Sequence, residues 1–156
     1  MIGSRSSPSR TGGESLRVFA RAFLCTGGVS PEESKRLIAV GNPGSMVLAA
    51  KAGLAENESF VELLAAQTLQ AESSGSLLAN RPEIDFLLRL AGTTQISKAI
   101  ENAGAKPGEP FILVVAGRTV VRGASGLDGT ELPRRELKDD ELGRIERAAL
   151  LNAKRA

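Results

Sequence analysis

Two acidic groups have the residue types that acid–base or metal chemistry uses. Glu83 and Asp85 lie two residues apart, so on a strand both carboxylates would point to the same face. Neighbouring carboxylates can hold their pKa values apart and act as acid and base. Asp139, Asp140 and Glu141 form the second group, and their oxygens suit Mg²⁺. Each group also has a simpler explanation, a solvated strand face for the first and a charged first helical turn for the second.

Few other side chains in the chain could act as a nucleophile or base. The 156 residues include no histidine, which excludes a Ser-His-Asp triad and most zinc and iron sites. The one cysteine, Cys25, follows Phe23 and Leu24, and these apolar neighbours predict a buried structural thiol in a reducing compartment. Lys98 would serve as a base only if buried, and we expect it to be an exposed cation. The sequence predicts no cofactor and no metal.

One junction could bind a phosphate group. The segment Ala91–Thr94 leads into a helix, and free backbone N–H groups at such a helix start can hold an anion. Thr93, Thr94 and Lys98 could assist. Every strand-to-helix junction offers such N–H groups in part. The glycine-rich segment 123–129 lacks both the P-loop motif and the dinucleotide fingerprint, so we expect a flexible loop there.

The strongest structural pattern lies between residues 83 and 117. Alternating apolar residues from Ile84 to Leu90 predict a strand with one buried face. Helical spacing after Gln95 predicts a helix, followed by a strand at Phe111–Val115 that is covered on both faces. The apolar face of this helix is expected to comprise Ile96, Ala99, Ile100 and Ala103.

The remaining elements complete a mixed domain. Further strands are expected at 16–25 and 46–50, with 119–122 continuing or pairing with the Phe111 strand, and further helices after Ser30 and at 59–72 and 136–153. We therefore predict a single α/β (α+β) domain over residues 14–156, with a small, mostly antiparallel sheet of four or five strands flanked by helices. Residues 1–13 are rich in Ser, Gly and Arg and predict a flexible tail.

Charge and hydropathy limit the possible locations and partners. The net charge is +2, from 20 basic and 18 acidic residues, which neither demands nor excludes a nucleic-acid partner. No apolar run approaches the roughly 20 residues of a membrane span. The N-terminus lacks the apolar segment of a secretory signal. These features predict a cytoplasmic protein without a membrane partner.

The central pattern resembles a known family. The run from Leu77 to Val115 is similar to the central and C-terminal part of the TPRKB-like, PRPK-binding small subunit of the KEOPS (EKC) complex. The match covers roughly residues 45–117, about half of the chain. The features that carry it are Ala65–Ala71, Ile84–Leu90, Gly92, the Gln95-Ile96 pair, Ala99–Gly104 and Ile112–Val115.

The resemblance implies a function without catalysis by this chain. The KEOPS complex adds the threonylcarbamoyl group to the adenosine beside the anticodon of certain tRNAs, and another subunit catalyses the reaction. The small subunit binds and stimulates an atypical kinase/ATPase and helps recruit tRNA through its single-stranded 3′ end. We therefore expect an accessory subunit that is not an enzyme, whose partners are the kinase, tRNA and, indirectly, the other KEOPS subunits.

The resemblance also suggests two contact surfaces. The expected kinase contacts are Leu77, Leu78, Leu87 on the outer face of its strand, and Leu150 in the last helix. The expected tRNA contacts are Lys51, Arg81, Arg89, Thr93, Thr94 and Lys98. Two alternatives stay open. The first is a stand-alone RNA-binding protein, and a continuous basic face without an exposed apolar patch would favour it. The second is a small-molecule enzyme that uses the Gly92–Lys98 junction, and a carboxylate or lysine with a perturbed pKa in a pocket would favour it.

Overall fold

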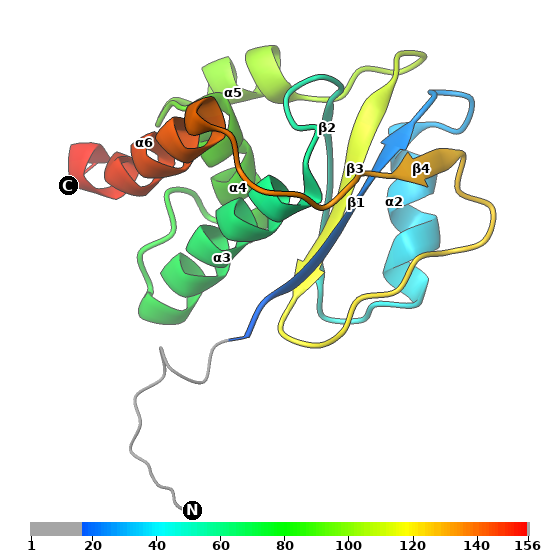
Figure 1. The fold of residues 1–156 in the computed structure, drawn as a ribbon, viewed down its shortest axis with the longest axis horizontal. Helices are drawn as coiled ribbons and strands as arrows, with labels where there is room; N and C mark the ends of the chain where they lie inside the picture. Colours follow the sequence, from blue (N-terminus) through cyan, green and yellow to red (C-terminus); the bar gives the residue numbers. More distant parts are fainter. Residues whose placement is uncertain (1–16, 156) are drawn as a thin grey trace, which may run out of the picture.

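A four-stranded antiparallel sheet forms the centre of the protein (Figure 1). The structure is a computed structural model, and it describes residues 17–155. The strands are β1 (Phe19–Cys25), β2 (Met46–Lys51), β3 (Phe111–Gly117) and β4 (Gly129–Glu131), and their order in the sheet is β2-β3-β1-β4. This architecture confirms the predicted fold class. The expected N-terminal tail lies outside the described residues.

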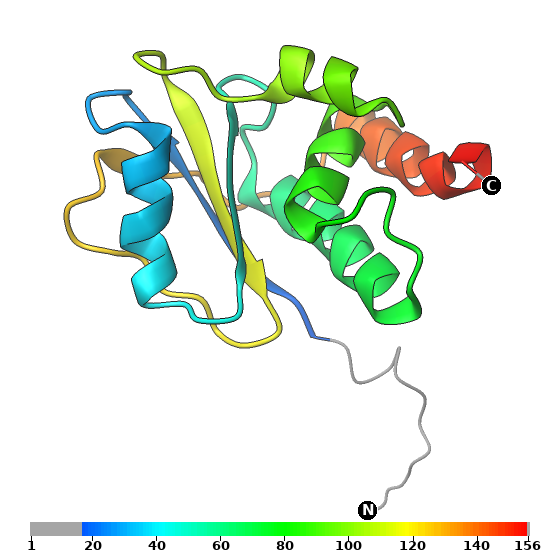
Figure 2. The same cartoon turned by 180° about the vertical axis from the view of Figure 1, so that it is seen from behind.

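Helices cover the two faces of the sheet unequally (Figures 1 and 2). One helix, α2 (Pro31–Val40), lies on one face. The helices on the other side are α3 (Glu58–Ser74), α4 (Pro82–Ala91), α5 (Ile96–Ala103) and α6 (Asp139–Arg155). No helix within residues 17–155 has the length and apolar character needed to cross a membrane.

The central strand β3 separates two apolar cores. Its alternate residues Ile112 and Val114 pack in the larger core with α3, α4, α5 and α6. Phe111 and Leu113 face the other way and pack with Ile38 of α2. Every residue of β3 is buried, which confirms the prediction of a strand covered on both faces.

The prediction of a strand at residues 83–90 is wrong, because this segment is the helix α4. Pro82 fits the first turn of a helix, and Gly92 ends it in the left-handed conformation at φ 76°. All six residues from Asp85 to Leu90 are buried. Ile84, Leu87, Leu88 and Ala91 recur at helical spacing, so the apolar residues of this segment fit a helix as well as an alternating strand pattern.

Two smaller differences concern loops and helix faces. Residues 119–122 form no strand beside β3, and the final helix begins at Asp139 instead of residue 136. The helix α5 is confirmed, but its four apolar residues are not equally buried. Ala99 and Ala103 are fully buried, whereas Ile96 and Ile100 are about half-exposed.

The lone cysteine is buried, as predicted. Cys25 is 1% exposed at the end of β1. Burial, with a smaller contribution from the charge of Asp128, raises the pKa of the Cys25 thiol to about 11. The thiol is therefore protonated at neutral pH and is a packing group of the α2-side core.

Candidate functional site

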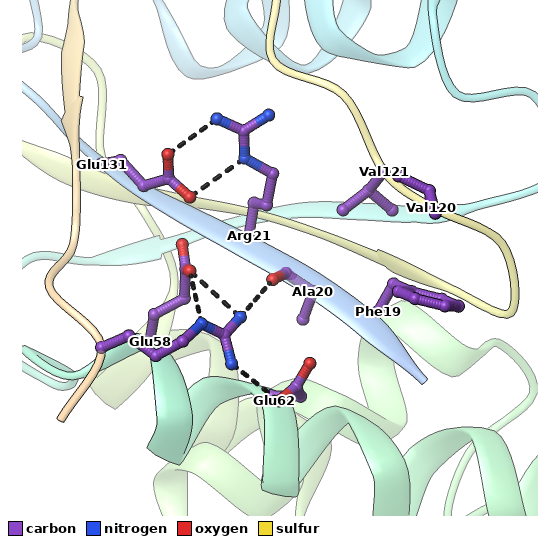
Figure 3. A pocket seen from close by; sticks show the side chains of 9 residues that line it. Phe19, Ala20, Arg21, Glu58, Glu62, Val120, Val121 and Glu131 are labelled. Atoms are coloured by element: carbon purple, nitrogen blue, oxygen red, sulfur yellow. Dashed lines mark hydrogen bonds and ion pairs between the residues drawn. The ribbon is translucent and has the colours of Figure 1, made fainter. Parts of the chain in front are cut away.

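Five charged side chains meet beside the outer edge of β1 and line a cavity of about 320 Å³ (Figure 3). We call them the Glu58 cluster, which consists of Arg21, Glu58, Glu62, Glu131 and Arg134. Phe19, Val120 and Val121 form an apolar part of the cavity wall. The cavity thus combines carboxylates and guanidinium groups with a small apolar surface.

The sheet topology explains why the cluster forms at this point. The short strand β4 pairs only with residues 23–25 of β1, so the preceding part of β1 has backbone groups that β4 does not reach. Glu58 accepts a hydrogen bond from the backbone N–H of Ala22 at 2.9 Å, and Arg134 donates to the carbonyl oxygen of Ala20 at 3.0 Å. These side chains continue the hydrogen bonding of the sheet edge, where unpaired backbone groups would otherwise invite another strand.

The cluster consists of two linked groups of ion pairs. Arg21 donates from Nε and Nη2 to the two carboxylate oxygens of Glu131 at 3.0 and 2.7 Å, which is the strong bidentate geometry. Arg134 donates from Nε to Glu58 at 3.2 Å and from Nη1 to Glu62 at 2.8 Å. Both arginines therefore use their fork of N–H donors within the domain.

Two carboxyl groups of the cluster have pKa values that move in opposite directions. Burial, followed by the proximity of Glu131, raises the pKa of Glu58. The hydrogen bond from Arg21 is the main reason that the pKa of Glu131 is lowered. Such a divergence is typical of acid–base pairs. Both oxygens of each carboxylate already accept hydrogen bonds inside the domain. The geometry therefore fits a structural role, in which the cluster links β1, α3 and β4.

The raised pKa of Glu58 predicts a specific dependence of stability on pH. The folded state binds the proton of Glu58 more tightly than the unfolded chain does. Protonated Glu58 therefore adds to the free energy of unfolding below the unfolded pKa of about 4.3, and this stabilisation is lost as pH rises through the folded pKa. In urea unfolding at a series of pH values, we expect the stability of Glu58→Gln relative to the wild type to improve as pH rises above about 4.3. A difference that stays constant with pH would contradict this.

The matched control for that measurement is Glu62→Gln. This change removes the other carboxylate that contacts Arg134 and leaves Glu58 in place. The free energy of unfolding of Glu62→Gln should keep the wild-type pH dependence above about pH 4.3. If both variants change this pH dependence in the same way, the cause is their shared contact with Arg134.

The residues expected to contact a kinase do not form one surface. Leu78 and Leu87 are buried in the larger core, 5% and 7% exposed. Leu77 is half-buried, and Leu150 of α6 is exposed. The expected outward position of Leu87 depended on the strand assignment, and the helix α4 turns this side chain into the core. Of the four, Leu150 is the most exposed, at 59%.

Five of the six residues expected to contact tRNA lie in three places, before α4, at the junction of α4 and α5, and at the end of β2. Arg81 precedes α4 and Thr93 follows it, so a ten-residue helix of about 15 Å separates them. Thr94 and Lys98 are exposed at the start of α5, where the Thr93 hydroxyl accepts the N–H of Gln95 at 3.1 Å. Lys51 is exposed at the end of β2, next to the Ala50–Gly104 bridge that follows α5.

Arg89 differs from the other expected tRNA contacts because it is 4% exposed. Its guanidinium pairs with Asp85 at 2.7 Å in the interior. Asp85 therefore does not form a carboxylate pair with Glu83, which lies near Arg81 at 3.6 Å. The structure thus assigns Arg89 and Asp85 to the core.

Of the three acidic residues at the start of α6, Glu141 has partners within the domain, whereas Asp139 and Asp140 are exposed. Glu141 is buried, and it accepts hydrogen bonds from the Lys138 backbone N–H at 2.9 Å and from Asn57 at 3.3 Å. Among residues 17–155, no group of three or more His, Cys, Asp or Glu side chains is arranged to hold a metal ion.

The exposed isoleucines of α5 were not recognised from the sequence as a surface. Ile96 and Ile100 are 46% and 52% exposed, one helical turn apart. A signal for this surface is the size difference within the apolar face of α5, since the small residues Ala99 and Ala103 make the close contact with the domain and the larger isoleucines lie beside it.

A search of known protein-family models and of curated proteins found no match to the sequence.

Proposed function

We propose that the protein is a non-catalytic accessory subunit of the KEOPS complex. In this role it binds and stimulates the atypical kinase/ATPase subunit and helps recruit tRNA for threonylcarbamoyladenosine modification in the cytoplasm. The proposal comes from the resemblance of residues 45–117 to the small kinase-binding subunit. The structural observation that supports it best is the partly uncovered apolar face of α5, which lies inside the resembling segment.

The α5 helix has the properties of a docking element. It contacts its own domain through fully buried Ala99 and Ala103, and it leaves Ile96 and Ile100 half-exposed on the adjoining side. Complete burial of an isoleucine side chain contributes about 1.5–3 kcal/mol, so burial of the exposed halves of two would contribute roughly that much together. Aliphatic side chains one turn apart are typical anchors of a helix that binds in a groove.

The polar side of the same helix suits a second partner. Lys98 follows Ile96 by two positions, which places it about 200° around the helix axis from that residue. Lys98 and Thr94 are exposed, and a lysine can neutralise a phosphate of a single-stranded 3′ end. One short helix could therefore contact the kinase with one side and tRNA with the other.

The decisive experiment is co-elution of the protein with the KEOPS kinase of the same organism in size-exclusion chromatography, with and without tRNA. The Ile96→Asp/Ile100→Asp variant should bind the kinase at least tenfold more weakly, because two charges would enter an apolar contact. The matched control is Leu142→Asp, which charges a leucine of α6 that is 45% exposed. Lys98→Glu should weaken tRNA retention and leave kinase binding unchanged.

Each outcome has a clear meaning. Failure of the wild-type protein to bind the kinase at tens of micromolar contradicts the proposal. Retention of tRNA without any kinase binding would favour the stand-alone RNA-binding protein. If Ile96→Asp/Ile100→Asp and Leu142→Asp change the affinity for the kinase equally, the kinase does not bind specifically through α5.

A further inference from the structure

The connection between β3 and α6 contains a long segment with little regular structure. We call residues 119–136 the strap, and the short strand β4 is its one regular element. Figure 1 shows it leaving β3 in yellow, passing α2 and crossing toward α6 in orange. Within the strap only Val121 and Leu132 are buried, one in each core. Irregular connections of this length are uncommon in compact domains and are often mobile or functional.

Two buried asparagines hold the ends of the strap through its backbone. Asn42, which is 5% exposed, accepts the Arg122 N–H at 2.7 Å and donates to the Arg122 carbonyl oxygen at 2.9 Å. Asn57 is fully buried, and it accepts the Arg135 N–H and donates to the Arg135 carbonyl oxygen, both at 3.1 Å. Each side-chain amide therefore binds both backbone groups of one residue, as a residue of an antiparallel neighbouring strand does.

Between the two asparagines, polar contacts attach the strap to the rest of the domain. Glu131 pairs with Arg21, and Arg134 pairs with Glu62. The side chains of these two pairs are between 32% and 46% exposed. Exposed ion pairs contribute little to stability because water competes for both charges. The strap is therefore attached less firmly than the strands that both cores cover.

The strap covers hydrogen-bonding groups at the outer edge of β1. Its strand β4 pairs with residues 23–25 of β1. The Leu132 N–H donates to the Ala22 carbonyl oxygen at 2.8 Å, and the Asp128 carbonyl oxygen accepts the Thr26 N–H at 3.1 Å. On its other side, β1 pairs with β3 over residues 19–25. Without the strap, a three-stranded sheet in the order β2-β3-β1 would remain, with β1 as a free edge.

We propose that the strap opens as one unit, released at Asn42 and Asn57, while the three remaining strands and the helices stay folded. Segments of low local stability open far more often than the whole domain unfolds. Opening uncovers the edge of β1, and a free strand edge can pair with another strand. The strap therefore controls access to β1. It includes no residue of α5, so this conformational change is independent of the proposed kinase binding.

The test is native-state amide hydrogen exchange, followed by NMR in a series of low urea concentrations. The reporters in the strap are the N–H groups of Arg122, Leu132 and Arg135, and the Thr26 N–H reports the edge of β1. We expect the protection factors of the four reporters to agree within about threefold. They should lie at least about tenfold below those of the β3 amides, which exchange when the whole domain unfolds.

Two variants test whether the strap opens as one unit. Asn42→Ala removes the hydrogen bonds to Arg122 and should lower the protection of the distant Leu132 and Arg135 amides by a common factor of about five or more. Glu131→Gln changes an exposed side chain instead and should lower the protection of the Arg122 and Arg135 amides by a smaller common factor.

The matched control is Ser30→Ala, which acts outside the strap. The Ser30 hydroxyl accepts the Glu33 N–H at 3.1 Å and caps α2. Because α2 stays folded when the strap opens, this change should lower the protection of the β3 amides about fivefold and leave the strap amides unchanged. An equal loss of protection in the strap and in β3 would contradict independent opening.

Three further results would overturn the proposal. Strap amides as strongly protected as those of β3 would show that the strap opens only when the domain unfolds. An effect of Asn42→Ala confined to residues near Arg122 would show that the strap frays piece by piece. A Thr26 amide that stays protected while the strap amides exchange would show that opening does not uncover the edge of β1.

Discussion

Replacing Asp85 with asparagine is expected to lower the free energy of unfolding by about 3–5 kcal/mol. Asp85 is fully buried in α4, and its carboxylate pairs with the buried guanidinium of Arg89 one turn later at 2.7 Å. The change removes the negative charge and leaves Arg89 uncompensated in the interior. Loss of one member of a buried ion pair is among the largest effects that a single substitution produces.

The hydrogen bonds of Asp85 explain why asparagine cannot replace it. The carboxylate accepts the Thr68 hydroxyl at 2.6 Å, the Leu78 backbone N–H at 2.9 Å and two N–H groups of Arg89. Every neighbour is a donor, so the NH₂ group of asparagine would face a donor and remain unpaired. Arg89 in turn donates to the carbonyl oxygen of Ala148 at 3.1 Å. This single carboxylate therefore connects α3, α4 and, through Arg89, α6.

The matched control for Asp85 is Glu83→Gln, two residues earlier on the same helix. Its ion pair with Arg81 is long, at 3.6 Å, and largely exposed, so the change should cost about 0.5 kcal/mol or less. Urea unfolding measures both variants. A further variant, Asp85→Leu/Arg89→Met, should be more stable than the sum of its single changes predicts, because it removes both buried charges. Equal effects at positions 83 and 85 would contradict the role given to Asp85.

The same residue shows how much of α4 could be predicted from the sequence. Asp85 and Arg89 are four positions apart, the spacing of an ion pair on a helix, and Pro82 and Gly92 stand where a helix begins and ends. The alternating apolar residues gave a competing strand pattern that ignored these signals. The helix α5 could be predicted because its apolar residues Ile96, Ala99, Ile100 and Ala103 recur at helical spacing.

The Glu58 cluster could not be predicted, for a different reason. Glu58 lies 73 and 76 positions from Glu131 and Arg134, as their residue numbers show. Local patterns carry no information about such contacts, which arise because the short strand β4 leaves part of β1 unpaired. The exposure of Ile96 and Ile100 depends in the same way on which surfaces the tertiary structure leaves uncovered, although the helix α5 itself could be predicted.

Replacing Phe60 with alanine is expected to lower the free energy of unfolding by about 3–5 kcal/mol. Phe60 is 1% exposed in the first turn of α3, so the change creates a cavity in the larger core. The Arg144 guanidinium also lies 4.6 Å from the centroid of this ring, and burial lowers the pKa of Arg144. The ring therefore stabilises a partly buried cation as well as filling the core.

Phe19→Ala is the matched control for Phe60, because it also removes a phenylalanine beneath a guanidinium. Arg17 lies 5.2 Å from the centroid of the Phe19 ring, but Phe19 is only partly buried. Urea unfolding should show a smaller loss for Phe19→Ala, since less apolar surface returns to water. The cost of Phe60→Ala should also exceed that of Phe60→Leu, which retains most of the volume. Equal losses at positions 60 and 19 would mean that the first turn of α3 is not anchored in the core by this ring.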